Sequence, residues 1–201
     1  MNRVNSKTGA STRQLIRITM LSAISFLLMA YQIPLPFIAP SFIQMDVSDL
    51  PIVVGSFAMG PVAGILISAL KNILHIVIKG TTTGGVGELS NFIIGSVFAF
   101  TAGFVYSRNK SFKSAFLGLF LGSLAMTGVS IISNYYFIFP LYSKLMPMDA
   151  IIEAGSIVTS KITDLWSMMM YSILPFNLIK GFSVSALAML IYKRVSPILK
   201  G

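Results

Sequence analysis

Long hydrophobic runs, separated by short polar or proline-rich stretches, dominate this 201-residue chain. A helix of ~20 apolar residues is long enough to cross the ~30 Å hydrocarbon core of a bilayer. The pattern predicts membrane-spanning helices over 14–33, 61–79, 88–106, 114–139 and 173–193.

A sixth, shorter helix is predicted between Ser48 and the Met-Gly-Pro sequence at 59–61. Ser48 is a suitable N-cap, Asp49 suits the first turn, and Pro51 is tolerated close behind it. Because this helix is short for a full crossing, we expect it to be tilted or partly interfacial.

The segments between the helices differ in character. Three prolines, at 34, 36 and 40, predict an extended loop over 34–47, because proline lacks an N–H and disfavours helix in the preceding residue. Residues 80–87 are glycine-rich and predict a turn. Residues 140–172 mix charged and apolar positions, which predicts a loop that holds a short amphipathic helix.

The composition supports a membrane protein. Hydrophobic residues make up 55% and charged residues 10%, with a mean hydropathy of +0.82, whereas soluble domains carry about 25% charged residues. A soluble chain of this size could not bury so much apolar surface. We therefore expect an all-α polytopic membrane protein with a single membrane domain, 1–201, that has a tail at 1–13 and a six-helix transmembrane bundle over 14–195.

The charge pattern predicts the orientation. The net charge of +9 could indicate nucleic acid, but the basic residues cluster between hydrophobic segments, so no nucleic-acid partner is expected. With six crossings all basic clusters fall on one side, as the positive-inside rule requires. Both termini are then cytoplasmic, in a multi-pass protein of the plasma membrane. The clusters are Arg3, Lys7, Arg13 and Arg17; Arg108, Lys110 and Lys113; and Lys193, Arg194 and Lys200.

Several function classes are excluded by what the sequence lacks. The basic N-terminus leads into an apolar stretch that is too long for a signal peptide and has no clear cleavage site, so it is expected to remain as the first helix. The absence of cysteine excludes thiolate metal sites and cysteine nucleophiles. No Walker A, dinucleotide or H-E-x-x-H motif is present, so the chain is not expected to be an enzyme that hydrolyses ATP through a P-loop.

Polar side chains gather at one end of three predicted helices. Glu88 and Asn91 share a face at the start of one helix, Asn134 lies near the end of the next, and Asn177 and Lys180 share a face early in the last. Such groups are costly in lipid and turn toward protein or water. They could bond one another, including a Glu88–Lys180 ion pair, or line a polar pocket under the 34–47 loop. Their convergence at one depth favours the pocket.

Aromatic residues concentrate on the same side. They could form an interfacial belt or stack on a flat heterocyclic ligand. The residues are Phe37, Phe42, Tyr135, Tyr136, Phe139, Tyr142 and Phe176.

Other polar residues have weaker functional interpretations. Lys71 and His75 are four residues apart and so share a helical face. They could form a proton relay, but packing or interhelical hydrogen bonding is the favoured interpretation. Asn72 could reach the floor of the pocket. Asp46 and Asp49 lie beside the proline loop, and we do not interpret them as a general acid–base pair.

Four segments together resemble a known family. They are PLPFIAPSFIQMDVSDLP after the first helix, GVGELSNF at the start of the 88–106 helix, NYYFIFPLY at the end of the 114–139 helix and LPFNLIKG in the last helix. In this order they are similar to the riboflavin-specific S component, the substrate-binding subunit, of energy-coupling factor (ECF) vitamin transporters. The resemblance spans residues 14 to about 195.

The resemblance implies a six-helix subunit that binds riboflavin near the outer face, with no cofactor. It also implies association with a transmembrane coupling subunit and two cytoplasmic ATPases. Amides suit riboflavin because it is uncharged and rich in donors and acceptors. The residues expected to bind it are Glu88, Asn91, Asn134, Asn177, Lys180, Phe42, Met45, Asp46, Tyr135 and Asn72.

Small residues on the first helix are expected to meet the coupling subunit. The family often carries an Ala-x-x-x-Ala pattern there, and this chain has Thr19, Ser22 and Ala23 instead. Small residues let helices approach closely.

Two alternatives stay open. The chain could be an S component for another vitamin, such as thiamin or biotin. It could also be a small intramembrane enzyme or proton-coupled carrier that uses Lys71, His75 and Glu88.

Overall fold

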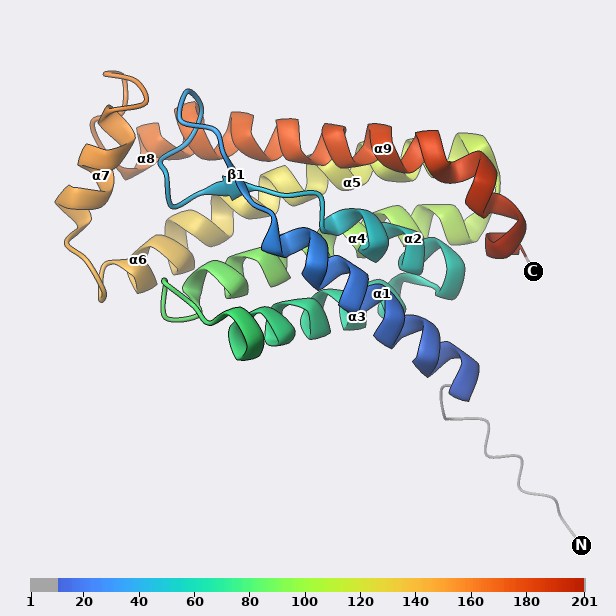
Figure 1. Cartoon of the computed structure of the whole chain (residues 1–201). Coiled ribbons are helices and arrows are strands. Elements are labelled where there is room, and N and C mark those ends of the chain that lie inside the picture. The colour runs from blue at the N-terminus through green and yellow to red at the C-terminus, as the bar shows by residue number, and fades with distance from the viewer. Residues whose placement is uncertain (1–10, 201) are drawn as a thin grey trace, which may run out of the picture.

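The structure, a computed structural model, describes residues 11–200. Most of the predicted tail over 1–13 therefore lies outside the described residues. The chain forms an elongated bundle of long helices, with short irregular elements at one end (Figure 1).

The long helices match the predicted hydrophobic runs, with shifted ends. They are α1 (Thr12–Ala30), α2 (Asp49–Met59), α3 (Pro61–Leu74), α4 (Val86–Arg108), α5 (Phe112–Ser133) and α9 (Leu174–Lys200). The short elements are β1 (Ile33–Pro34), β2 (Gln44–Met45), α6 (Phe139–Tyr142), α7 (Met148–Ser156) and α8 (Leu165–Met168), with three π-helical stretches, η1 (His75–Lys79), η2 (Asn134–Ile138) and η3 (Met169–Ile173).

Five helical segments in the described part of the chain are long and apolar enough to cross a membrane. They are Thr12–Ala30, Pro61–Lys79, Val86–Arg108, Phe112–Tyr142 and Leu165–Tyr192. Helix α2 has 11 residues, about 16 Å at 1.5 Å per residue, so it is too short to span by itself. The described chain thus has five helices that are long and apolar enough to cross a membrane and one short apolar helix, as expected of a polytopic membrane protein.

The two ends of the bundle differ. One end, called the closed end, holds the turn from α2 to α3, the connection 109–111 and the last turns of α9 (Figure 1). The other end holds the connection 80–85, helix α7 and the segment 31–47, called the roof (Figure 1).

Small residues bring the helices together toward the closed end. A Cβ added to Gly118 of α5 would lie 2.7 Å from the backbone oxygen of Ala102 in α4. A Cβ on Gly103 of α4 would collide with the Ser56 hydroxyl of α2. That hydroxyl donates to the Ala99 carbonyl over 2.7 Å. Close helix packing of this kind stabilises membrane bundles, where lipid removes the hydrophobic drive between helices.

The predicted ends of two helices were wrong. The 114–139 helix does not stop at Pro140 but continues through α6 to Tyr142, and the last helix begins at Leu165 rather than 173. Pro140 and Pro175 each lie two residues after the end of a π-helical stretch. The regular i−4 hydrogen bond is already lost in such a stretch, so the missing proline N–H costs little.

The start of the last helix carries a capping signal that the hydrophobic pattern did not reveal. Asp164 accepts a hydrogen bond from the Ser167 backbone N–H at 2.8 Å, and the Ser167 hydroxyl accepts from the Asp164 N–H at 3.0 Å. This capping box begins α8.

The roof, predicted as an extended loop, contains a short two-stranded antiparallel sheet. Strands β1 and β2 pair in antiparallel fashion, with Ile33 opposite Met45 and Pro34 opposite Gln44. Phe42 and Ile43 of the roof pack against a buried cluster that includes Phe139 and Ile151. Helix α7, the expected amphipathic helix within 140–172, contributes Ile151 to this cluster.

Candidate ligand-binding site

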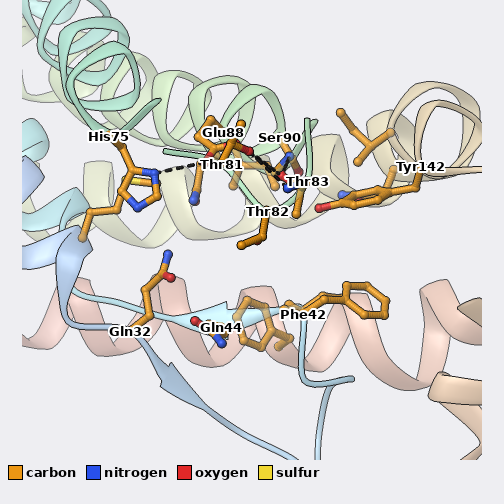
Figure 2. Close-up of a pocket in the computed structure, with 18 of the residues that line it drawn as sticks. Gln32, Phe42, Gln44, His75, Thr81, Thr82, Thr83, Glu88, Ser90 and Tyr142 are labelled. Atoms are coloured by element: carbon orange, nitrogen blue, oxygen red, sulfur yellow. Dashed lines mark hydrogen bonds and ion pairs between the residues drawn. The ribbon is translucent and has the colours of Figure 1, made fainter. Parts of the chain in front are cut away.

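A hollow of about 520 Å³ opens at the roof end of the bundle. This volume lies within the ~300–1,000 Å³ range of small-molecule sites. Figure 2 shows Glu88, Ser90 and three threonines on one wall, with Gln32, Gln44 and Phe42 facing them from the roof. The wall residues used below are Gln32, Phe42, Gln44, His75, Lys79, Thr81, Thr82, Thr83, Glu88, Ser90, Asn91, Asn134, Phe139, Tyr142, Phe176, Asn177 and Lys180.

Two buried asparagines present amides to the hollow from π-helical surroundings. Asn134 opens η2, and its side-chain N–H donates to the Ser130 carbonyl at 2.8 Å. Asn177 lies one turn after η3 and donates to the Ile173 carbonyl at 2.9 Å. Each amide is oriented by its own helix through one N–H. The amide oxygen and second N–H remain for a ligand.

Lys180 of α9 stands between the hollow and a buried ion cluster. Its Nζ donates to Asp46 at 3.2 Å and to the Asn91 amide oxygen at 3.2 Å, and it lies 3.5 Å from Asp49. Lys180 is only 3% exposed, so its charge requires these partners. The ammonium group is therefore held at the wall of the hollow.

The ion cluster ties four helices together below the roof. Lys71 of α3 donates to Asp49 at 3.0 Å and to the Ser48 hydroxyl at 2.9 Å. Ser48 in turn donates to Asp46, and its carbonyl accepts from Ser25 of α1. Two carboxylates and two ammonium groups make the cluster neutral, which allows its burial.

The charge of Asp46 follows from this setting. Burial by itself would raise the pKa of its carboxyl, but the ammonium groups of Lys180 and Lys71 and the hydrogen bonds from Ser48 lower that pKa to about 2.

The Glu88–Lys180 ion pair, one of the two alternatives left open by the sequence, is not formed. Lys180 pairs with Asp46 and Asp49, whereas Glu88 contacts His75 through Nδ1 at 3.0 Å. Glu88 also accepts hydrogen bonds from Thr81 at 3.0 Å and Thr83 at 3.3 Å. This alternative is wrong because two acids, from the end of the roof and the start of α2, reach Lys180 instead. Sequence spacing does not reveal that proximity.

Aromatic rings close the side of the hollow nearest α6. The Phe42 ring lies 6.0 Å from Tyr142, and Phe139 lies 6.1 Å from Tyr142. Phe42 reaches these rings from the roof (Figure 2). Faces of this kind can sandwich a flat ring system.

The structure brings together six of the ten predicted ligand-binding residues: Phe42, Glu88, Asn91, Asn134, Asn177 and Lys180 line the hollow. The other four lie behind its wall. Asp46 holds Lys180, and Met45 lies in strand β2. Tyr135 packs edge-on against Trp166 at 5.7 Å. Asn72 of α3 donates to the Ser68 carbonyl at 2.8 Å.

Sequence reasoning missed several wall residues. Thr81, Thr82 and Thr83 lie in the predicted turn, where Gly80, Gly84 and Gly85 adopt positive φ angles that glycine tolerates. A run of threonines next to a buried acid was an available signal. Gln32 and Gln44, at the two ends of the roof, carried no comparable signal.

The small residues on α1 divide between two faces. Thr19 and Ala23 are exposed, whereas Ser22 is buried and donates to the Ile18 carbonyl at 2.8 Å.

The hollow offers mainly neutral donors and acceptors, aromatic faces and the Lys180 ammonium group that the ion cluster fixes, with Lys79 as a second basic residue of its lining. Residues 11–200 contain no cluster of three or more His, Asp or Glu side chains that could hold a metal ion. The arrangement suits a small, polar, uncharged molecule with a flat apolar part. Fold and site together define a polytopic membrane protein with a hollow at one end that suits such a molecule.

Comparison with known proteins identifies the family. Residues 13–192 match the family described as ECF transporter, substrate-specific component. The chain belongs to this family, whose members are transport subunits rather than enzymes.

Individual relatives agree with this assignment. The chain is 33% identical to the riboflavin transporter FmnP of Bacillus subtilis (strain 168), over 92% of this chain and 93% of the relative. It is 35% identical to the riboflavin transporter RibU of Staphylococcus aureus (strain TCH60), over 94% and 93% respectively. A solved structure titled as the S component of a bacterial ECF transporter superposes with a TM-score of 0.73 at 33% identity, covering 94% of this chain and 98% of that one.

Proposed function

We propose that this chain binds riboflavin in the hollow and mediates its uptake as the substrate-specific component of an ECF transporter. The observation that carries the proposal is the likeness, over more than nine-tenths of the chain, to two proteins named riboflavin transporters. The chemistry of the hollow supports it independently.

Riboflavin has a flat tricyclic ring with imide-like donors and acceptors at one edge and a hydroxylated side chain. The amides of Asn134 and Asn177, with Lys180 and Asn91, match the polar edge of the ring. Phe42, with Tyr142 and Phe139 beyond it, offers aromatic faces for the ring itself.

Four further residues support this arrangement from behind the wall. Asp46 holds the Lys180 ammonium group in place, and Asn72 supports the floor from α3. Met45 orders the roof through its strand pairing, and Tyr135 steadies η2 against Trp166. Glu88 serves the hydroxylated side chain of the ligand through the polar network that it organises.

The orientation follows from counting α2 as a sixth, short crossing of a single membrane domain. An even number of crossings puts both termini in the cytoplasm. Arg13, Arg17, Arg108 and Arg194 then lie on the cytoplasmic side, as the positive-inside rule requires. The hollow faces outward, in the plasma membrane, where it captures the vitamin.

Transport requires partner chains. A transmembrane coupling subunit and two cytoplasmic ATPases supply the energy that releases riboflavin inside the cell. Thr19 and Ala23 are small and exposed on α1, so a helix of the coupling subunit can pack closely against them. Ser22 packs within the bundle instead.

Riboflavin titration of detergent-purified protein by calorimetry tests the proposal. We expect one site, a flavin absorption spectrum in the bound state, and no competition from thiamin or biotin. Binding of thiamin or biotin in place of riboflavin would assign the chain to another vitamin. Riboflavin uptake that persists without ATPases but collapses with the proton gradient would make it a proton-coupled carrier.

A further inference from the structure

The wall opposite the roof contains an imidazole with one unused nitrogen. His75 is 6% exposed and lines the hollow at the start of η1. Its Nδ1 lies 3.0 Å from the Glu88 carboxylate, while its Nε2 is buried without a hydrogen-bond partner among the described residues. Only one of the two ring nitrogens therefore has a hydrogen-bond partner among the described residues.

The partner of Nδ1 determines the character of Nε2. A carboxylate only accepts hydrogen bonds, so Nδ1 carries the hydrogen in this contact. In the neutral imidazole Nε2 is then an acceptor. A buried acceptor without a donor is unfavourable, which makes Nε2 a strong candidate for a hydrogen bond from a ligand.

The Glu88 carboxylate is largely committed to protein groups. One oxygen accepts from His75, and the other accepts from Thr81 and Thr83. Glu88 therefore acts mainly by orienting the imidazole and the two hydroxyl groups. His75 Nε2 is a further atom left for a ligand at this wall.

Gln32 provides the opposite side of this region. In Figure 2 its side chain rises from the roof toward the His75 ring. Gln32 is only partly buried, so its side chain is free to reorient toward a ligand in this region. Its amide can donate to, and accept from, the same ligand group.

We propose that His75 and Gln32 form a hydroxyl-binding subsite that recognises the polyol chain of the ligand through acceptance at His75 Nε2. This inference rests on the proposed function and deepens it. The aromatic rings and the two asparagine amides hold the flat ring system, whereas His75 discriminates ligands that carry a hydroxylated chain from those that do not.

A ligand pair separates these two parts of the site. Lumiflavin carries the same ring system as riboflavin with a methyl group in place of the polyol. In His75→Leu we expect riboflavin affinity to fall about tenfold, the effect of one buried hydrogen bond, with lumiflavin affinity unchanged. His75→Gln keeps an acceptor and should recover most of the loss. Asn177→Ala is the contrasting variant, because it should weaken both ligands equally.

A second measurement avoids any substitution. His75 is the single histidine of the chain, so ¹⁵N-histidine labelling gives one imidazole signal in the wild-type protein. Saturating riboflavin should shift the Nε2 resonance, and saturating lumiflavin should leave it in place.

The outcomes distinguish the two proposals. Wild-type protein that binds no flavin contradicts the proposed function. Wild-type protein that binds riboflavin, with the Nε2 resonance unmoved or with both ligands weakened equally by His75→Leu, contradicts the subsite alone.

Discussion

The two ends of the bundle differ in packing: the helices are in close contact at the closed end and surround a polar hollow at the other end. At the closed end, glycines and serines let helices touch, and the buried tyrosines Tyr106 and Tyr192 pair through their hydroxyl groups at 3.2 Å. At the hollow end, the same helices carry amides, charged groups and π-helical turns around an open space. Close packing supplies stability, while the hollow keeps polar groups incompletely satisfied for a ligand. Substitutions at the two ends should therefore separate stability from affinity.

Lys180→Met should have the largest effect, because Lys180 belongs to both the ion cluster and the wall. It leaves Asp46 buried without its closest ammonium partner, which costs about 3–5 kcal/mol of stability. Riboflavin affinity should fall about 100-fold or more. Thermal unfolding in detergent and calorimetry measure the two effects.

The double variant Lys180→Met/Asp46→Asn sharpens this test. Removing both charges should restore much of the stability without restoring affinity. Recovery of binding in the double variant would show that the ammonium group does not contact the ligand.

Gly118→Leu should act at the closed end. The new side chain meets the Ala102 backbone, so α4 and α5 must separate at a cost of about 1–3 kcal/mol. The unfolding temperature should fall, while the protein that remains folded keeps its riboflavin affinity. Gly128→Leu on the same helix is the matched control, because a Cβ there meets nothing within 4 Å.

Asn177→Ala should have the opposite effect to Gly118→Leu: it should lower riboflavin affinity and leave stability nearly unchanged. It removes the amide oxygen and N–H that face the hollow, so affinity should fall about tenfold. The unfolding temperature should stay close to wild type, because the one side-chain hydrogen bond that Asn177 makes within residues 11–200 goes to the Ile173 carbonyl, one turn before it. Equal affinity for wild type and variant would remove Asn177 from the site.

Tyr106→Phe should have the smallest effect. It deletes one buried hydroxyl contact with Tyr192, worth about 0.5–1.5 kcal/mol of stability. Riboflavin affinity should not change, because the hollow lies at the other end. A clear affinity change, measured by calorimetry, would mean that the two ends are coupled.

The site was partly predictable because helical spacing places neighbouring residues on one face. Asn177 and Lys180 were expected together for this reason, as were Glu88 and Asn91, and all four line the hollow. Their partners were not predictable. Asp46 and Asp49 lie more than 130 residues before Lys180 in the chain, and only packing brings them within reach.

The sequence alone determined the class of fold, because hydrophobic length and low charge leave a helix in lipid as the favourable structure for these segments. It also determined where the polar residues cluster along each helix. The tertiary structure decided which polar groups pair: Lys180 with the aspartates, Glu88 with His75. It also decided that prolines 140 and 175 follow π-helical turns instead of ending helices. The physical reason is that a buried charge or amide takes the partner nearest in space, and nearness in space is set by how the helices pack.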